Sequence, residues 1–224
     1  MPVMEPDLDA GVLRNWARAI DDGPFSSLCW GERIAFGNPE ALTLLGALAA
    51  WTDRVPLITT VVVPQLHDPV LLAKSLATGD MLSGGRLTVG IGVGGRHEDY
   101  RAVGADPATQ TMREMAQRVG VMRQVWAGEK LTDSVLPVGP RPARDGGPRL
   151  LVGTIGPKTL RHAAGWAVRL AGIPAVWLEH DPHRMGWWFR HFSPGRAELT
   201  PPPVMQLLWG DANEWVHYAA HAQT

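Results

Sequence analysis

Runs of β-branched apolar residues alternate with amphipathic stretches along most of this chain, and this alternation is what most limits its possible folds. Residues 13–22 carry apolar side chains at helical spacing and end at Gly23-Pro24, while residues 25–30 have the composition of a strand. Residues 55–63 are almost continuously apolar and β-branched, which is typical of a strand covered on both faces. Strands that alternate with helices predict a parallel sheet, either doubly wound or closed into a (β/α) barrel.

The same alternation places the other elements. We expect strands near Val3 and over residues 25–30, 55–63, 86–92, 149–153, 168–173 and 204–209. We expect helices over residues 13–22, 39–52, 71–82, 111–126 and 157–166. Residues 128–148 are rich in Pro and Gly and predict a loop, and residues 174–203 are an irregular, aromatic and His-rich segment. No linker divides the chain, so we expect one domain over residues 1–224.

Composition excludes several partners. The chain has 21 Lys and Arg against 22 Asp and Glu and no basic run, so we expect no nucleic-acid binding. No apolar run reaches the roughly 20 residues of a membrane-spanning helix, so we expect no membrane association. The single cysteine, Cys29, cannot form an internal disulfide, and no basic and apolar leader opens the chain. These features predict a cytoplasmic protein.

Glycines follow the expected strand 86–92 at positions 90, 92, 94 and 95. Glycine allows a ligand to approach the backbone closely and allows positive φ, so this run is a candidate ligand loop. The alternative is a barrel strand with no room for side chains. A dinucleotide fingerprint requires a helix to open at once, with an acidic residue about 20 positions later. The charged stretch 96–100 disfavours that fingerprint.

Residues 152–159 are a second candidate binding segment. A strand there leads through glycine into a helix with proline in its first turn, where free N–H groups and the helix dipole suit a phosphate. Lys158 and Thr159 can add donors. The alternative is a plain strand-to-helix turn, because most turns of this kind bind nothing.

Glu32 and Arg33 follow the strand 25–30, and His67 follows the strand 55–63. The carboxyl ends of barrel strands face the active site, so these three are our candidates for substrate polarisation or proton transfer. An intramolecular ion pair is an equally good interpretation. We expect no metal, because the eight histidines lack ligand-like spacing to carboxylates apart from the segment 180–191, which fits a solvated loop equally well.

Residues 54–63, 67–78, 80–95 and 151–166, in this order, closely resemble the bacterial luciferase-like superfamily of flavin- and deazaflavin-dependent oxidoreductases. The resemblance implies a (β/α)8 TIM-type barrel that binds FMN or an 8-hydroxy-5-deazaflavin at its C-terminal face. It also implies an enzyme, an oxidoreductase or monooxygenase that acts on a small organic substrate, with a bacterial biosynthetic pathway as one setting.

The resemblance also implies roles for particular residues. A non-prolyl cis peptide beneath the cofactor ring falls near Thr60, Val61 and Val62. The ring and phosphoribityl chain lie by Gly92, Gly94 and Gly95. The cofactor phosphate is held by the turn that contains Thr154, Ile155, Gly156 and Thr159.

The chain departs from the family in three places. Many members have a proton-relay histidine where this chain has Glu32-Arg33-Ile34, and Arg33 cannot act as a general acid at neutral pH. Some members have a basic residue in place of Val93-Gly94. The eighth strand has no counterpart, so we expect a barrel that is incomplete at its C-terminal end.

An incomplete barrel exposes a strand edge, so we expect a homodimer that covers it. The tail offers aromatic surface for such an interface or for an ordinary core, at Trp187, Trp188, Trp209 and Trp215. Two other functions remain open, a flavin-binding accessory protein without redox activity and a cofactor-free cyclase or isomerase. The missing histidine and strand favour them, whereas the glycine run and the Gly-Pro-Lys turn oppose them.

Overall fold

The computed structural model describes residues 3, 8–131, 133 and 136–153. Its strands are β1 (Leu28–Trp30), β2 (Leu57–Thr59), β3 (Leu87–Ile91) and β4 (Arg149–Val152). Its α-helices are α1 (Ala10–Asp22), α2 (Ala41–Trp51), α3 (Pro69–Leu82), α4 (His97–Ala102) and α5 (Met112–Trp126). Two 3₁₀ turns, η1 (Pro64–Leu66) and η2 (Pro107–Thr109), lie within the connections.

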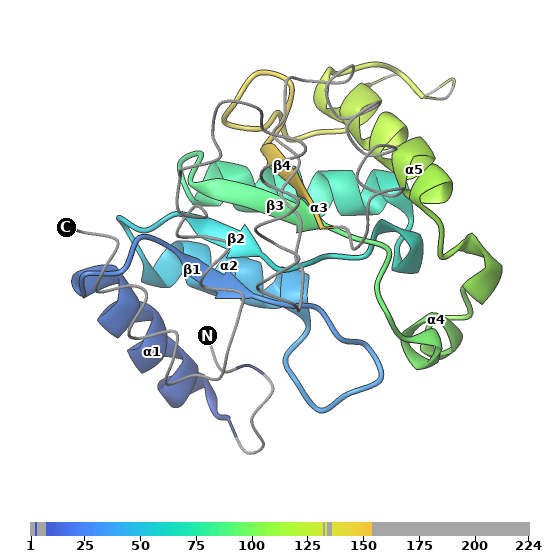
Figure 1. The fold of residues 1–224 in the computed structure, drawn as a ribbon. Coiled ribbons are helices and arrows are strands. Elements are labelled where there is room, and N and C mark those ends of the chain that lie inside the picture. The colour runs from blue at the N-terminus through green and yellow to red at the C-terminus, as the bar shows by residue number, and fades with distance from the viewer. Residues whose placement is uncertain (1–2, 4–7, 132, 134–135, 154–224) are drawn as a thin grey trace, which may run out of the picture.

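The four strands form one parallel sheet in the order β1-β2-β3-β4, which is also their order along the chain. A doubly wound sheet reverses its strand order, whereas the wall of a (β/α) barrel does not. Figure 1 shows α2 and α3 together behind the strands. Among the helices, α1 packs on α2, α2 on α3 and α3 on α5. The expected barrel-type α/β fold is therefore confirmed for this part of the chain.

The helices begin where side chains satisfy their first free N–H groups. Asp9 accepts from the Val12 N–H at 2.8 Å at the start of α1. Asp68 accepts from the first turn of α3, in which Pro69 occupies a position that needs no N–H donor. Glu40 caps α2 in the same way. These local caps explain why helix starts can be read from the sequence.

Two arginines and one aspartate bond to the backbone at the edge of the sheet where the strands begin. The Arg54 guanidinium donates to carbonyls at the end of α1, and Arg86 donates to carbonyls at the end of α2. Buried Asp21 accepts from the backbone N–H groups of residues 53–55 at 2.8–2.9 Å. These bonds fix the chain just before β2 starts.

The core lies between the strands and the outer helices. Its largest fully buried side chains include Trp30, Leu48, Leu76, Ile91 and Met115. The ring nitrogen of Trp30 donates to the Ala41 carbonyl at 3.0 Å, and that of Trp126 donates to the Ala73 carbonyl at 2.9 Å. Two tryptophans therefore serve as core residues whose polar atoms are satisfied.

The structure corrects two expectations. The expected strand 55–63 is shorter and spans Leu57–Thr59, and Val62 beyond it forms an isolated parallel bridge with Ile91. On either side of Val62, the Val61 carbonyl and the Val63 N–H bond to Glu32 in the loop after β1. The charged stretch 96–100, expected to disfavour a helix directly after the glycines, forms most of α4, which buries Asp99 and Tyr100.

The sequence predicts a strand near Val3, but Val3 itself is buried in a turn, and its sequence neighbours 1–2 and 4–7 lie outside the described part. So do the strands expected at 168–173 and 204–209, the helix at 157–166 and the segment 174–203. The incomplete end of the barrel, the tail tryptophans and the homodimer therefore stay predictions. In the part of the chain that the structure describes, no helix is long and apolar enough to cross a membrane.

Candidate active site

The described site candidates lie in the loops that follow the first three strands. Glu32 and Arg33 follow β1, the segment 60–67 follows β2, and the glycine loop, residues 92–95, follows β3. Because parallel strands end at the same edge, these loops meet at the carboxyl edge of the sheet. In Figure 1 the strand arrows point toward this edge, and the chain leaves β3 there to enter α4. Thr154, Ile155, Gly156 and Thr159 lie outside the described residues.

A non-prolyl cis peptide bond joins Thr60 to Val61, where the family resemblance implies one. Backbone bonds tie this segment to both neighbouring strands. The Thr60 N–H donates to the Trp30 carbonyl at 2.7 Å, and the Val62 N–H donates to the Gly90 carbonyl at 2.8 Å. The Val61 side chain is half-buried. The segment therefore presents a partly exposed apolar side chain at the edge of the sheet.

The glycines of this edge differ in what they do. A Cβ at Gly90 would overlap the Thr59 carbonyl oxygen, and one at Gly92 would lie 2.8 Å from the Val61 side chain. These two glycines allow β2 and β3 to approach closely. Gly94 has φ +66°, and Gly95 is exposed with open space around its Cβ position. Lack of room for a side chain thus explains Gly90 and Gly92, whereas Gly94 and Gly95 stay candidates for a ligand loop.

Glu32 and His67 are brought into direct contact. His67 Nε2 lies 2.8 Å from Glu32 Oε1, and the Val63 N–H donates to Glu32 Oε2 at 2.8 Å. The Glu32 side chain is 1% exposed and that of His67 is 17% exposed. A carboxylate and an imidazole in this arrangement can hold one proton between them.

Arg33 forms ion pairs with two acidic residues of α4. Its Nε donates to Asp99 at 2.8 Å, and its Nη2 lies 3.4 Å from Glu98. Asp99 also accepts from the N–H groups of Ile34 and Ala35. For Arg33 the structure favours the intramolecular ion pair over a catalytic role.

Asp99 is held in its ionised form. Burial by itself opposes ionisation of this carboxyl, but the hydrogen bonds from the Ala35 N–H, from Arg33 and from the Ile34 N–H outweigh burial. The pKa of Asp99 is therefore lower than its ordinary value. Asp99 thus fixes the loop after β1 to α4.

Sequence reasoning missed the residues that support these loops. The Tyr100 hydroxyl donates to the Val93 carbonyl at 2.8 Å, and Gln110 Nε2 donates to the Gly94 carbonyl at 2.8 Å. Arg118 donates to the His67 carbonyl at 2.7 Å. Burial raises the pKa of Tyr100 to about 12, so it remains a hydroxyl donor at neutral pH. A tyrosine within a charged stretch was the one signal in the sequence that this stretch has a buried face.

An open groove of about 640 Å³ lies between α2 and α3, outside the sheet. His67 and Ile34 stand among its lining residues, so the groove adjoins the loops of the site. Within the described ranges, no three His, Cys, Asp or Glu side chains gather as a metal-binding group. The histidines of the segment 180–191 lie outside these ranges.

The family model described as luciferase-like monooxygenase matches residues 5–206. This chain belongs to the luciferase-like monooxygenase family. An F420-dependent glucose-6-phosphate dehydrogenase of Beutenbergia cavernae is 34% identical to this luciferase-like chain over 96 residues, which are 42% of this chain and 29% of the relative. The 4-hydroxyprotoasukamycin monooxygenase of Streptomyces nodosus is 31% identical over 123 residues, 53% of this chain and 32% of the relative. Each match thus spans about a third of the curated relative.

A solved structure shares the fold. It is the oxygenating constituent of 3,6-diketocamphane monooxygenase from Pseudomonas putida, in complex with FMN, with a TM-score of 0.69 and 17% identity. The match covers 93% of this luciferase-like chain and 63% of that one. The similarity supports the barrel-type fold.

Proposed function

We propose that this protein binds FMN or an F420-type deazaflavin at the carboxyl edge of its sheet and acts as an oxidoreductase or monooxygenase on a small organic substrate. The observation that carries the proposal is the meeting, at one edge, of the segment 60–62 and the glycine loop in a luciferase-like barrel. Relatives named for F420 and monooxygenase activity support it.

The residues present fit such a cofactor. Gly95 leaves open space where any other residue would place a side chain, so a flat ring or its phosphate-bearing chain can approach the backbone. Val61 offers a half-buried apolar side chain next to Gly92, at the start of the same loop. Neither the Gly94 nor the Gly95 N–H has an acceptor among the described residues, which leaves two donors for ligand oxygens.

When bound, a reduced flavin or deazaflavin supplies the electrons that pass to an organic substrate or to oxygen. The protein positions the cofactor and provides a group that can transfer a proton. The bonds of Glu32 to Val61 and Val63 fix the segment beside the proposed ring position. The Glu32–His67 pair holds a proton next to this segment, and half-buried His67 can exchange it with solvent.

A flavin-binding accessory protein is the second candidate. It is favoured by the internal bonds of Glu32 and Arg33, which leave neither side chain free to reach a substrate by itself. Such a protein would bind the cofactor without turnover.

Cofactor titration tests the proposal. We expect FMN or the deazaflavin to bind the purified protein with a micromolar dissociation constant, measured by quenching of cofactor fluorescence. Gly95→Leu should abolish binding, because its side chain fills the open space at the glycine loop. Gly120→Leu, on α5, is the matched control, because its Cβ also meets nothing within 4 Å.

Absence of binding of either cofactor to the unaltered protein would contradict both candidates. If a cofactor binds, the reduced form is then mixed with air and with candidate substrates. Oxidation faster than that of the free reduced cofactor supports an oxidoreductase, and an unchanged rate supports the accessory protein.

A further inference from the structure

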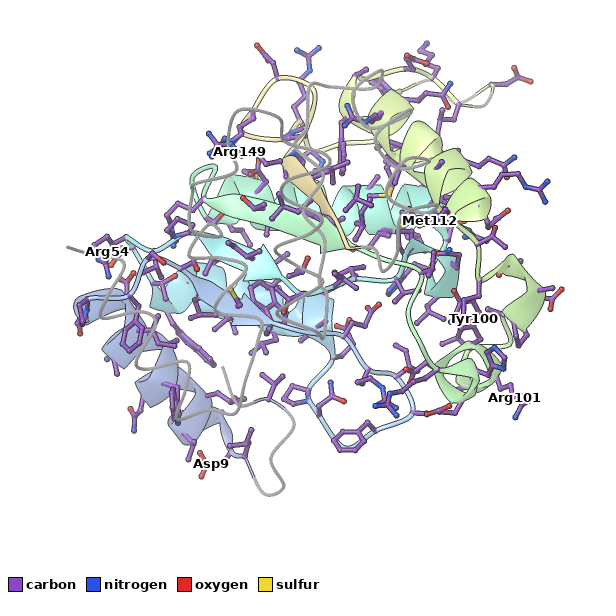
Figure 2. All side chains as sticks on the ribbon, viewed as in Figure 1. Asp9, Arg54, Tyr100, Arg101, Met112 and Arg149 are labelled. Atoms are coloured by element: carbon purple, nitrogen blue, oxygen red, sulfur yellow. The ribbon has the colours of Figure 1, made fainter. Side chains whose placement is uncertain are left out.

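Two side chains of the segment 97–110, which includes α4 and η2, donate hydrogen bonds to two successive carbonyls of the glycine loop. The Tyr100 hydroxyl donates to the Val93 carbonyl, and Gln110 Nε2 donates to the Gly94 carbonyl, both at 2.8 Å. Tyr100 is 1% exposed and packs with Val63 and Leu66. Figure 2 shows Tyr100 on the inner side of α4 and Arg101 on its outer side. The loop is thus held by one buried side chain, Tyr100, and one half-buried side chain, Gln110.

These bonds determine where the amides of the loop point. In a trans peptide unit the C=O and the N–H point in opposite directions. The two units that join residues 93 to 95 are trans. Since their carbonyls are turned toward Tyr100 and Gln110, the N–H groups of Gly94 and Gly95 point away from the segment 97–110. Neither has an acceptor among the residues that the structure describes.

Two adjacent amides around a residue with positive φ suit an anion. Successive N–H groups next to a left-handed residue form a concavity that binds phosphate-like groups, and Gly94 has φ +66°. Arg96 adds positive charge directly after the loop. Its side chain is 59% exposed and approaches Glu98 no closer than 3.9 Å.

We propose that Tyr100 and Gln110 are positioning residues that aim the Gly94 and Gly95 amides at a phosphate group. The phosphate belongs either to the cofactor or to a phosphorylated substrate. Which molecule bears the phosphate rests on the proposed function. The direction of the Gly94 and Gly95 N–H groups rests on the hydrogen bonds alone. The backbone amides thus take the place of the basic side chain that this loop lacks.

The first test compares cofactors with and without a phosphate. Tyr100→Phe and Gln110→Leu each remove one donor to the loop. If the phosphate is that of the cofactor, each should raise the dissociation constant of FMN about tenfold, the effect of one lost hydrogen bond. Riboflavin has no phosphate, so its dissociation constant should change less than about twofold. Gln124→Leu, at an exposed position of α5, should change neither. A general loss of structure would weaken both ligands equally, and that result would overturn the proposal.

The second test needs no flavin. Inorganic phosphate is titrated into ¹⁵N-labelled protein, and the backbone resonances of Gly94 and Gly95 are followed. We expect saturable shifts in the unaltered protein and weaker binding in the Tyr100→Phe, Gln110→Leu double variant. Unshifted Gly94 and Gly95 resonances in the unaltered protein would overturn the proposal.

The same titration identifies the source of the phosphate. Loss of the shifts at saturating FMN assigns the amides to the cofactor phosphate, and their persistence assigns them to a substrate phosphate. If flavin does not bind but phosphate still shifts both resonances, the proposed function fails and the positioning role stands. If flavin binds but the variants weaken FMN and riboflavin alike, the positioning role fails and the proposed function stands.

Discussion

His67 Nε2 lies 2.8 Å from Glu32 Oε1 in the structure, although 35 positions separate the two residues in the chain. The pair joins the loop after β1 to the loop after β2 at the carboxyl edge of the sheet. Arg118 fixes the other side of this arrangement through the His67 carbonyl. A buried carboxylate needs such partners, because burial of an unpaired charge is costly.

Glu32→Gln should lower the turnover rate of the oxidoreductase reaction about 100-fold, because the amide cannot take up a proton. The amide oxygen can still accept from the Val63 N–H, so the cofactor dissociation constant should change little. Turnover is measured across pH 5–9 together with cofactor affinity. Glu129→Gln, at an exposed position, is the control. An unaltered rate across this pH range would rule out a proton-transfer role for Glu32.

Asp99→Asn should lower the free energy of unfolding by about 3 kcal/mol, because it leaves the Arg33 guanidinium without its close, largely buried partner. Urea unfolding at pH 7 measures the change. Glu98→Gln removes the exposed partner of the same arginine and should cost less than about 1 kcal/mol. Equal effects of the two substitutions would show that Asp99 does not hold this loop.

Acid should weaken the fold partly through Asp21. Burial alone would raise the pKa of this carboxyl, but hydrogen bonds from the N–H groups of Asp53, Val55 and Arg54 outweigh burial and lower it. The stabilisation is therefore fully present above the ordinary value of 3.8 and is lost as the pH falls through the lower folded value.

Asp21→Asn should therefore flatten the dependence of the free energy of unfolding on pH below about pH 4. Urea unfolding at several pH values measures this slope. Asp22→Asn, at the neighbouring exposed position, should leave the slope as in the unaltered protein. A slope that Asp21→Asn does not alter would contradict the role given to the three backbone bonds.

Gly90→Ala should destabilise the protein by about 3 kcal/mol, because its Cβ would overlap the Thr59 carbonyl oxygen, which belongs to the backbone of β2. Gly120→Ala on α5 meets open space and should stabilise the helix by up to about 1 kcal/mol. Thermal unfolding compares the two variants. A stable Gly90→Ala variant would show that β2 and β3 can separate at this point.

The order of the elements could be predicted from the sequence because the signals are local. Apolar spacing over residues 13–22 predicted α1, and caps such as Asp68 mark helix starts within one turn. The candidate loops follow from strand ends, since every strand of a barrel delivers its carboxyl end to the same face. The location of the cis peptide also followed from the resemblance.

The sequence by itself determined the barrel-type fold, the family and the edge where the candidate residues gather. The tertiary structure decided which of these residues meet: Glu32 with His67, Arg33 with Asp99, and Tyr100 with the glycine loop. The pairing of Arg33 with Asp99 spans 66 positions, and no periodicity within either segment encodes it. Such contacts arise when two loops are packed together and their buried polar groups must find partners, which is settled by the fold as a whole.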